Sequence, residues 1–142
     1  MKYWDSSALV PLLMEEARTA GLQKILSTDA EIITWWGSRI ECRSALYRQQ
    51  RDGRLKESIV AAAELVLVTL ARRWLEIGAS EIVRETAERL LRGHPLRSGD
   101  ALQLASTIVA ADFRPSNLQF VCCDQRLAAA ARQEGFSVTG DR

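Results

Sequence analysis

Residues 2–10 read KYWDSSALV, and this stretch decides the fold. The bulky residues 2–4 predict a short strand, because aromatic side chains favour a pleated surface. Asp5 follows directly, and Ser6 or Ser7 can cap a helix whose apolar part begins at Ala8. An acid between a strand and a helix is typical of the binding crevice in an α/β protein, so we ask whether other acids reach the same place.

The rest of the chain alternates between strand-like and helix-like segments. We expect further strands at residues 31–36, 74–77, 118–123 and 136–139. We expect helices at about residues 6–26, 39–51, 55–72, 80–91, 98–112 and 125–134. This alternation predicts a three-layer α/β/α sandwich with a short, mostly parallel central sheet, in one domain that covers residues 1–142.

The composition is that of an ordinary globular protein, with 142 residues, 47% apolar and 26% charged. A net charge of +1 gives no support for a strongly basic nucleic-acid binder. The three cysteines form no CxxC pair, which argues against a disulfide framework or a structural zinc site and favours the reducing cytoplasm. The longest apolar stretch, residues 59–71, contains Glu64 and is shorter than the ~20 residues that span a bilayer, so we expect no membrane segment.

Four acids are candidates for a site, and each has a structural explanation of its own. Asp5 and Asp124 follow predicted strands and can cap the next helix. Glu41 stands three residues after Ser38, which is the spacing of a capping box. Asp100 falls in the first turn of a helix, where the helix dipole favours a negative charge.

The acids become more informative when they are taken together. Asp5, Asp124 and Glu41 should face one edge of a parallel sheet, whereas Asp100 follows a helix and topology alone does not bring it there. Carboxylates that are 4 Å apart repel by roughly 4 kcal/mol at an effective dielectric near 20, so a cation should lie among them. No lysine follows Lys56, and an oxygen-only cluster suits Mg²⁺ or Mn²⁺ better than zinc.

Four motifs along the whole chain carry a resemblance to a known family. They are DSSALV at 5–10, IECRSAL at 40–46, LRSGDALQLA at 96–105, and DQRLAAA at 124–130 with EGF at 134–136. In this order and spacing they resemble the PIN domain, and within it the VapC-type toxin ribonucleases of type II toxin–antitoxin pairs.

The resemblance implies a function. Asp5, Glu41, Asp100 and Asp124 match the family's catalytic metal ligands and would hold one or two Mg²⁺ or Mn²⁺ ions. Ser7 matches a small hydroxyl residue that often lies beside the metal. The implied reaction is hydrolysis of RNA that leaves a 5′-phosphate, and the implied partners are a small antitoxin protein and a second copy of the chain in a homodimer.

Several arginines could contact RNA phosphates, although a solvated charged surface explains them equally well. These are Arg39, Arg43, Arg97 and Arg126. The neighbouring Trp35 and Trp36 could stack on bases, or serve core packing and partner contacts.

Two other functions compete with the metal-dependent ribonuclease. An aspartyl-phosphate protein, either a receiver domain or a phosphatase, would also place Asp5 at a strand end, but it needs a late lysine that this chain lacks. A non-catalytic PIN-like module that binds RNA or protein would keep the acids as helix caps. Nucleotide-cofactor enzymes have no support, since neither GxGxxG nor GxxxxGK occurs.

Overall fold

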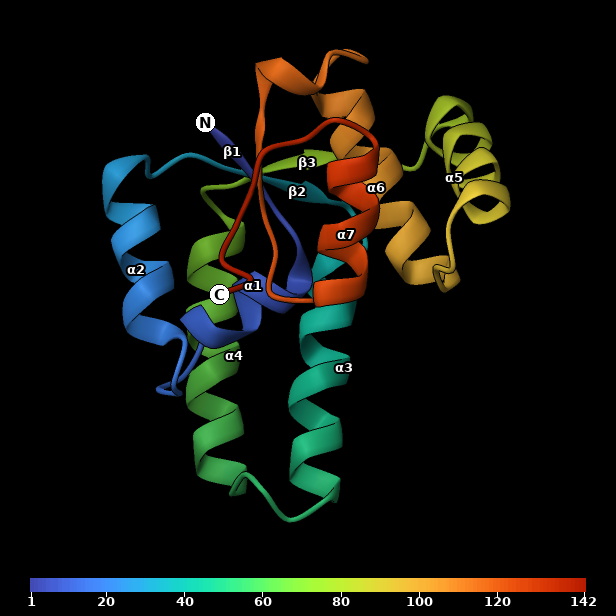
Figure 1. Ribbon diagram of the computed structural model, residues 1–142. Helices are drawn as coiled ribbons and strands as arrows, with labels where there is room; N and C mark the ends of the chain where they lie inside the picture. The colour runs from blue at the N-terminus through green and yellow to red at the C-terminus, as the bar shows by residue number, and fades with distance from the viewer.

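The computed structural model describes the whole chain, residues 1–142, around one five-stranded sheet. The strands are β1 (Lys2–Trp4), β2 (Ile32–Trp35), β3 (Leu75–Ile77), β4 (Gln119–Val121) and β5 (Val138–Thr139). Their order is β3-β2-β1-β4-β5 and every neighbouring pair is parallel, so the stretch that opens the sequence lies at the centre of the sheet (Figure 1). The predicted sheet is confirmed, and it is wholly rather than mostly parallel.

The helices occupy both faces of this sheet. They are α1 (Ser6–Leu9), α2 (Thr19–Thr28), α3 (Ser38–Arg51), α4 (Glu57–Ala71), α5 (Glu81–Gly93), α6 (Ser98–Ala110) and α7 (Gln125–Gln133), with short 3-10 turns at Val10–Leu12 and Pro115–Asn117. One core cluster joins the sheet to α5, α6 and α7, and a second joins it to α1, α2, α3 and α4. Tyr3 belongs to the first cluster and Trp4 to the second, as expected for neighbours on a strand, and the three-layer prediction is confirmed.

The single helix expected over residues 6–26 is wrong. It divides into the one-turn helix α1, the 3-10 turn that contains Pro11, and α2. Proline lacks the N–H that a continuing helix needs. The buried hydroxyl of Thr19 then fastens the turn, because it lies 2.7 Å from the carbonyl oxygen of Pro11 and accepts the N–H of Glu16 at 2.9 Å.

The helices α3 and α4 form an antiparallel pair that extends beyond the end of the sheet (Figure 1). Their inner sides are apolar, with Leu46 of α3 and Leu67 of α4 fully buried. Their outer sides keep Leu65 72% exposed and Tyr47 37% exposed. No helix, α4 included, combines the length and the apolarity that crossing a bilayer requires.

Candidate active site

Asp5 and Asp124 occupy the carboxyl ends of the neighbouring strands β1 and β4. Asp5 caps α1 by accepting the N–H of Ser7 at 3.0 Å, and Asp124 caps α7 by accepting the N–H of Leu127 at 2.9 Å. The two acids differ in environment, since Asp5 is 3% exposed and Asp124 is open to solvent. Both acids therefore cap a helix and also share one edge of the sheet.

Glu41 does not form the capping box that its spacing from Ser38 predicted. Ser38 is fully buried, where its hydroxyl lies 2.7 Å from that of Thr34. Glu41 points instead towards α1 and α6, and its Oε2 accepts hydrogen bonds from the hydroxyl of Ser6 at 2.7 Å and from Nε2 of Gln103 at 3.3 Å. Ser38 is the first residue of α3, but its hydroxyl is bonded within the core and does not cap the helix, which leaves Glu41 available at the edge of the sheet.

Asp100 joins the other acids because α6 starts at the same edge of the sheet. Its carboxylate is half-buried in the first turn of α6, 3.4 Å from the N–H of Arg97. All four acids line one open cavity of about 600 Å³. The sequence predicted by topology that three acids meet, and the structure places Asp100 with them.

The acids around this cavity influence one another's protonation. Burial raises the pKa of Asp5 to about 7, and the carboxylates of Glu41 and Asp100 add to the rise while hydrogen bonds from Ser7 oppose it. Burial likewise raises the pKa of Glu41, with a further contribution from Asp100. Burial also raises the pKa of Asp100, with a further contribution from Asp124. The cavity therefore brings together several carboxylates whose negative charges repel one another. No cation lies on its buried side to balance these charges.

The donor set fits a hard divalent cation. Four carboxylates and nearby serine hydroxyls supply oxygen alone, which Mg²⁺ and Mn²⁺ prefer, and neither histidine nor cysteine lines the cavity. The side chains as they stand do not form a complete coordination sphere, because no three acidic, histidine or cysteine groups lie close enough together to hold an ion. The fit rests on donor chemistry and on the charge that the cavity concentrates.

Ser7 connects the two acids at the strand ends. Its hydroxyl donates to Asp5 Oδ2 and accepts the N–H groups of Cys123 at 2.9 Å and Asp124 at 3.2 Å. These contacts fill the bonding capacity of a hydroxyl with protein groups. Ser7 lines the cavity, and its hydrogen bonds to Asp5 hold that carboxylate in position; its place beside a metal stays a prediction of the resemblance.

Gln103 is a residue of the site that the sequence reasoning missed. It is 1% exposed, accepts the hydroxyl of Tyr3 at 2.8 Å, and donates to Ser38 at 3.0 Å as well as to Glu41. Gln103 lies one helical turn after Asp100, on the same face of α6. The signal that could have revealed it is an amide between Leu102 and Leu104, one helical turn after a candidate acid.

Two of the four arginines singled out in the sequence lie beside the acids. Arg97 and Arg126 line an adjoining hollow of about 370 Å³ together with Asp100 and Asp124. Arg97 also lines the acidic cavity itself. The two guanidinium groups therefore flank the more exposed half of the acid cluster.

The other two, Arg39 and Arg43, point into a separate hollow of about 230 Å³. They stand two residues before and after Glu41, and a helix turns such positions away from it. Arg48 lines the acidic cavity instead, because seven residues after Glu41 bring it back to the same face of α3. The 3.6-residue period of α3 is enough to place Arg48 on the face of Glu41, and it makes Arg48 a better candidate than Arg39 or Arg43 for this cavity.

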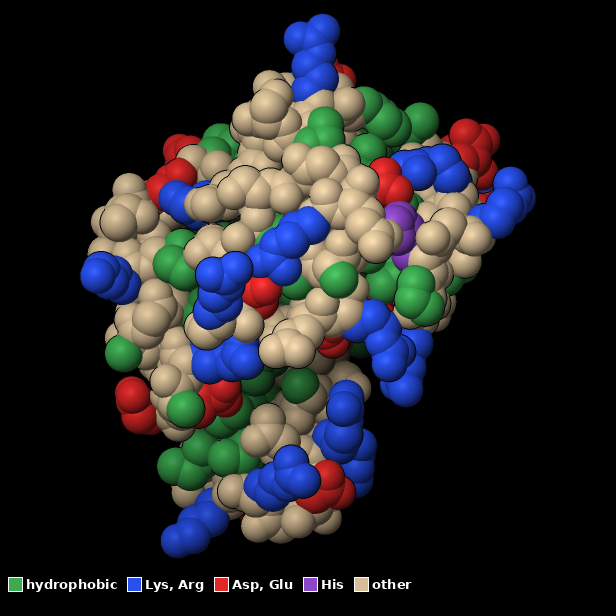
Figure 2. All heavy atoms as spheres, viewed as in Figure 1, with side chains coloured by type: hydrophobic (Ala, Val, Ile, Leu, Met, Phe, Trp, Pro, Cys, Tyr) green, Lys and Arg blue, Asp and Glu red, His purple; other side chains and the backbone are tan.

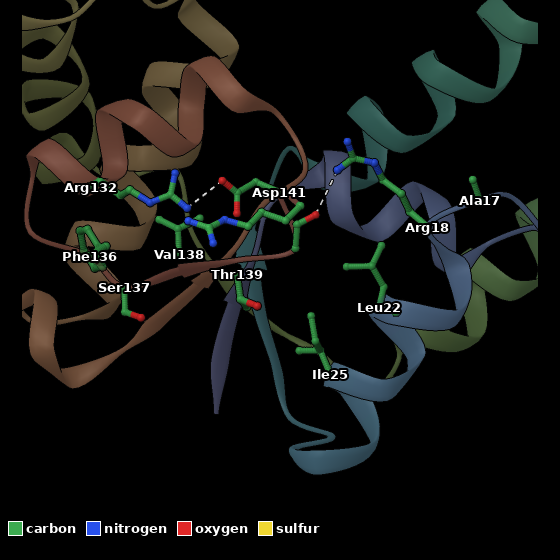
Figure 3. A pocket seen from close by; sticks show the side chains of 13 residues that line it. Ala17, Arg18, Leu22, Ile25, Arg132, Phe136, Ser137, Val138, Thr139 and Asp141 are labelled. Carbon is green, nitrogen blue, oxygen red and sulfur yellow. Dashed lines mark hydrogen bonds and ion pairs between the residues drawn. The ribbon is translucent and has the colours of Figure 1, made fainter.

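The remaining candidate groups lie away from the acids. His94 pairs with Glu134 at 2.7 Å, and Figure 2 shows this single histidine beside an acidic side chain. A larger hollow of about 710 Å³ lies between α2 and the chain end, where Arg132 pairs with Asp141 at 2.7 Å (Figure 3). Its one acidic side chain is thus already paired, so this hollow offers no second acidic site.

A parallel sheet with an acidic cavity at its carboxyl edge is the architecture expected of a PIN-domain protein. Ribonucleases VapC45 and VapC49 from two strains of Mycobacterium tuberculosis are each 33% identical to this chain, over 96% of it and 92% of their own length. The chain belongs to the family of VapC ribonucleases, within the PIN-domain proteins, and the resemblance found in the sequence is confirmed. A search against protein-family models gave no match.

Two solved structures share the fold. PAE2754 from Pyrobaculum aerophilum superposes with a TM-score of 0.66 at 22% identity, covering 97% of this chain and 83% of its own. A toxin-antitoxin complex from Klebsiella pneumoniae gives a TM-score of 0.57 at 14% identity, covering 90% of this chain and 91% of its own. At these identities the likenesses establish the fold alone.

Proposed function

We propose that the chain is an endoribonuclease that depends on Mg²⁺ or Mn²⁺ and acts as the toxin of a toxin–antitoxin pair. The observation that carries the proposal is the cavity lined by Asp5, Glu41, Asp100 and Asp124, in which the pKa values of the first three acids are raised. The names of the two mycobacterial relatives support RNA as the substrate. The reaction is hydrolysis of a phosphodiester bond that leaves a 5′-phosphate.

The four carboxylates would hold the metal. When bound, a divalent ion lowers the pKa of a coordinated water and neutralises phosphate charge. Asp5 and Glu41 are oriented before any ligand arrives, because Ser7 holds the first and Ser6 and Gln103 hold the second. Hydrogen bonds from neighbouring residues keep groups that bind a ligand directly, here the two carboxylates, in a productive geometry.

The arginines around the cavity would bind the RNA backbone. Arg97 and Arg126 lie beside the exposed acids, and Arg48 enters from α3. Their guanidinium groups offer paired N–H donors that match phosphate oxygens, and they reduce the repulsion between RNA and the acids. These three residues would place a phosphate at the mouth of the cavity.

The partners are a small antitoxin and a second copy of the chain. The Klebsiella complex, which shares the fold, supports an antitoxin. Exposed apolar side chains on α3 and α4, among them Tyr47, Ile59 and Leu65, offer surface for such contacts. Light scattering of the purified chain would test the homodimer, and copurification with the product of the neighbouring small reading frame would test the antitoxin.

The decisive test is cleavage of single-stranded RNA by the purified chain. We expect cleavage with Mn²⁺ or Mg²⁺, none with EDTA, and none by Asp100→Asn, which keeps the shape of the side chain and removes its charge. Cleavage that persists in EDTA, or in both Asp100→Asn and Asp5→Asn, contradicts the proposal. In cells, growth arrest on expression should require Asp5 and be relieved by the neighbouring reading frame.

The competing functions give different results in the same preparation. A non-catalytic module would bind RNA without cutting it, and millimolar Mn²⁺ would not raise its melting temperature. An aspartyl-phosphate protein needs a lysine beside the acid, but no lysine lines the cavity and Lys2 lies 3.5 Å from Asp29 instead. The structure thus gives the phosphoryl-transfer alternative no support.

A further inference from the structure

Trp36 is the one tryptophan of four that reaches the surface. Its side chain is 54% exposed, whereas Trp4, Trp35 and Trp74 are 0%, 7% and 7% exposed. Exposure alone does not assign a role to an aromatic ring, since Phe113 is equally exposed, so the surroundings of Trp36 decide what it can bind.

Trp36 lies at the edge of the sheet that carries the acids, with its backbone fixed to β3 and its ring against Trp35. Trp36 follows β2 directly, and its backbone N–H donates to the backbone carbonyl of Ile77 at 2.9 Å. Its ring meets that of the buried Trp35 edge-on, with centroids 6.2 Å apart and planes at 73°. Gly37 comes next, where a Cβ would collide with the Trp35 ring. Glycine is therefore required for this arrangement of the two rings.

A hollow of about 230 Å³ opens beside Trp36, lined by two arginines. Arg39 is exposed and forms no ion pair, while Arg43 lies 3.4 Å from Glu64. Glu76 also lines the hollow, and its carboxylate accepts the indole N–H of Trp74 at 3.1 Å. The cation that remains free for a ligand is Arg39.

This hollow adjoins the acidic cavity, because Ile40 lines both. A chain molecule that enters the acidic cavity can therefore continue over Ile40 onto Trp36. Stacking of bases on aromatic side chains, together with cations that follow the backbone, is the general way in which proteins hold single-stranded nucleic acid.

We propose that Trp36 and Arg39 form a binding subsite for one nucleotide of single-stranded RNA next to the acidic cavity. The base stacks on the Trp36 ring, and the neighbouring phosphate contacts the Arg39 guanidinium. The subsite rests on the proposed function in one respect, namely that the same RNA passes through the acidic cavity.

Tryptophan fluorescence tests the subsite without any need for cleavage. The probe is a short oligoadenylate, added to the Asp5→Asn chain in EDTA. We expect it to quench the emission of the exposed Trp36, and Trp36→Phe should lose most of this quenching while its affinity in a filter-binding assay stays within about threefold. Trp36→Ala should bind about tenfold more weakly, which corresponds to about 1.4 kcal/mol. Arg39→Gln should reduce the salt dependence of binding by about one phosphate contact, a slope change of roughly 0.7.

Phe113→Ala is the matched control, because Phe113 is an aromatic side chain with the same 54% exposure and lines neither hollow. In the Asp5→Asn chain, Phe113→Ala should leave binding of the oligoadenylate unchanged. Quenching without cleavage by the parent chain would keep the subsite and reject the nuclease. Cleavage combined with no quenching, or with unchanged binding by Trp36→Ala, overturns the subsite and leaves the nuclease standing.

Discussion

The two halves of the acid cluster are built differently. Asp5 and Glu41 form an inner half, in which hydroxyl and amide donors from α1 and α6 hold the carboxylates. Asp100 and Asp124 form an outer half, held by N–H groups of their own helix starts and flanked by arginines. The inner half is thus a product of the packed core, and the outer half is a product of local helix geometry.

This difference separates the roles of stability and binding. Burying a charged carboxylate is unfavourable unless it is hydrogen-bonded or paired. The raised pKa of Asp5 reflects this free-energy cost of burial. The outer acids are closer to solvent and can adjust to a ligand. Substitutions in the inner half should therefore change stability as well as activity, whereas substitutions in the outer half should change activity with little effect on stability. The solvent-exposed Asp124 should matter least to activity.

The largest contrast should come from replacing one acid in each half. Loss of a residue that hydrogen-bonds a metal ligand typically reduces metal affinity or activity by ~10–100-fold. Loss of the buried ligand Asp5 should exceed this, whereas water can replace the solvent-exposed carboxylate of Asp124 at a smaller cost. We expect Asp5→Asn to reduce Mn²⁺-dependent RNA cleavage by about 1000-fold or more, and Asp124→Asn by about tenfold. Equal losses in single-turnover assays would show that the two halves do not differ.

The second contrast concerns the stability of the metal-free protein. The folded pKa of Asp5 is about 7 against an ordinary 3.8, so the folded state holds a proton that the unfolded state releases. The stabilisation is complete below pH ~3.8 and is lost as pH rises through ~7, a difference of up to about 4 kcal/mol from this group. Urea unfolding in EDTA at several pH values measures it.

Asp5→Asn is the control for that measurement, because an amide does not titrate. The rise in the pKa of Glu41 and Asp100 acts in the same direction, so the relevant quantity is the difference between the parent chain and the variant. This difference should shrink below pH ~4. If the two chains lose stability in parallel as pH rises, Asp5 is not the titrating group.

The third contrast tests whether Gln103 supports the inner half. Gln103→Met keeps the volume but removes the donor to Glu41 and the acceptor for Tyr3. We expect Mn²⁺ affinity, measured by calorimetry, to fall by ~10–100-fold, with a loss of about 1–3 kcal/mol in stability from unpaired buried groups. Thr107→Val is the matched control, since Thr107 is fully buried in α6 and donates to the backbone carbonyl of Gln103 at 2.8 Å, not to an acid. Equal Mn²⁺ affinity in the two variants would remove Gln103 from the site.

The sequence predicted the sheet well, because strand and helix patterns alternate and short strands lead straight into helices. It failed where a distant contact decides the local structure. The first helix ends early since Thr19 fastens a turn against Pro11, and no periodicity reveals that contact. The capping box at Ser38 failed for a similar reason, because burial beside Thr34 outweighs a local helix cap.

For the site, strand ends alone were enough to bring Asp5 and Asp124 together. Asp100 required the direction of α6, which depends on packing across the sheet and entered the prediction only through family resemblance. Gln103 was missed because its partners are distant in sequence, with Tyr3 a hundred residues away. Arg48 could have been found from the sequence, because it depends only on the period of α3.

The smallest effect is expected at the rim of the outer half. Arg126 flanks Asp100 and Asp124, so Arg126→Gln should weaken RNA binding a few-fold and change the salt slope by about 0.7, the share of one phosphate on a single strand. Arg132→Gln lies on the same helix and makes the same change in charge, but its partner is Asp141. Filter binding over a range of KCl should show the slope change in Arg126→Gln alone. A similar change in both variants would mean that net charge, and not a contact at the acids, determines binding.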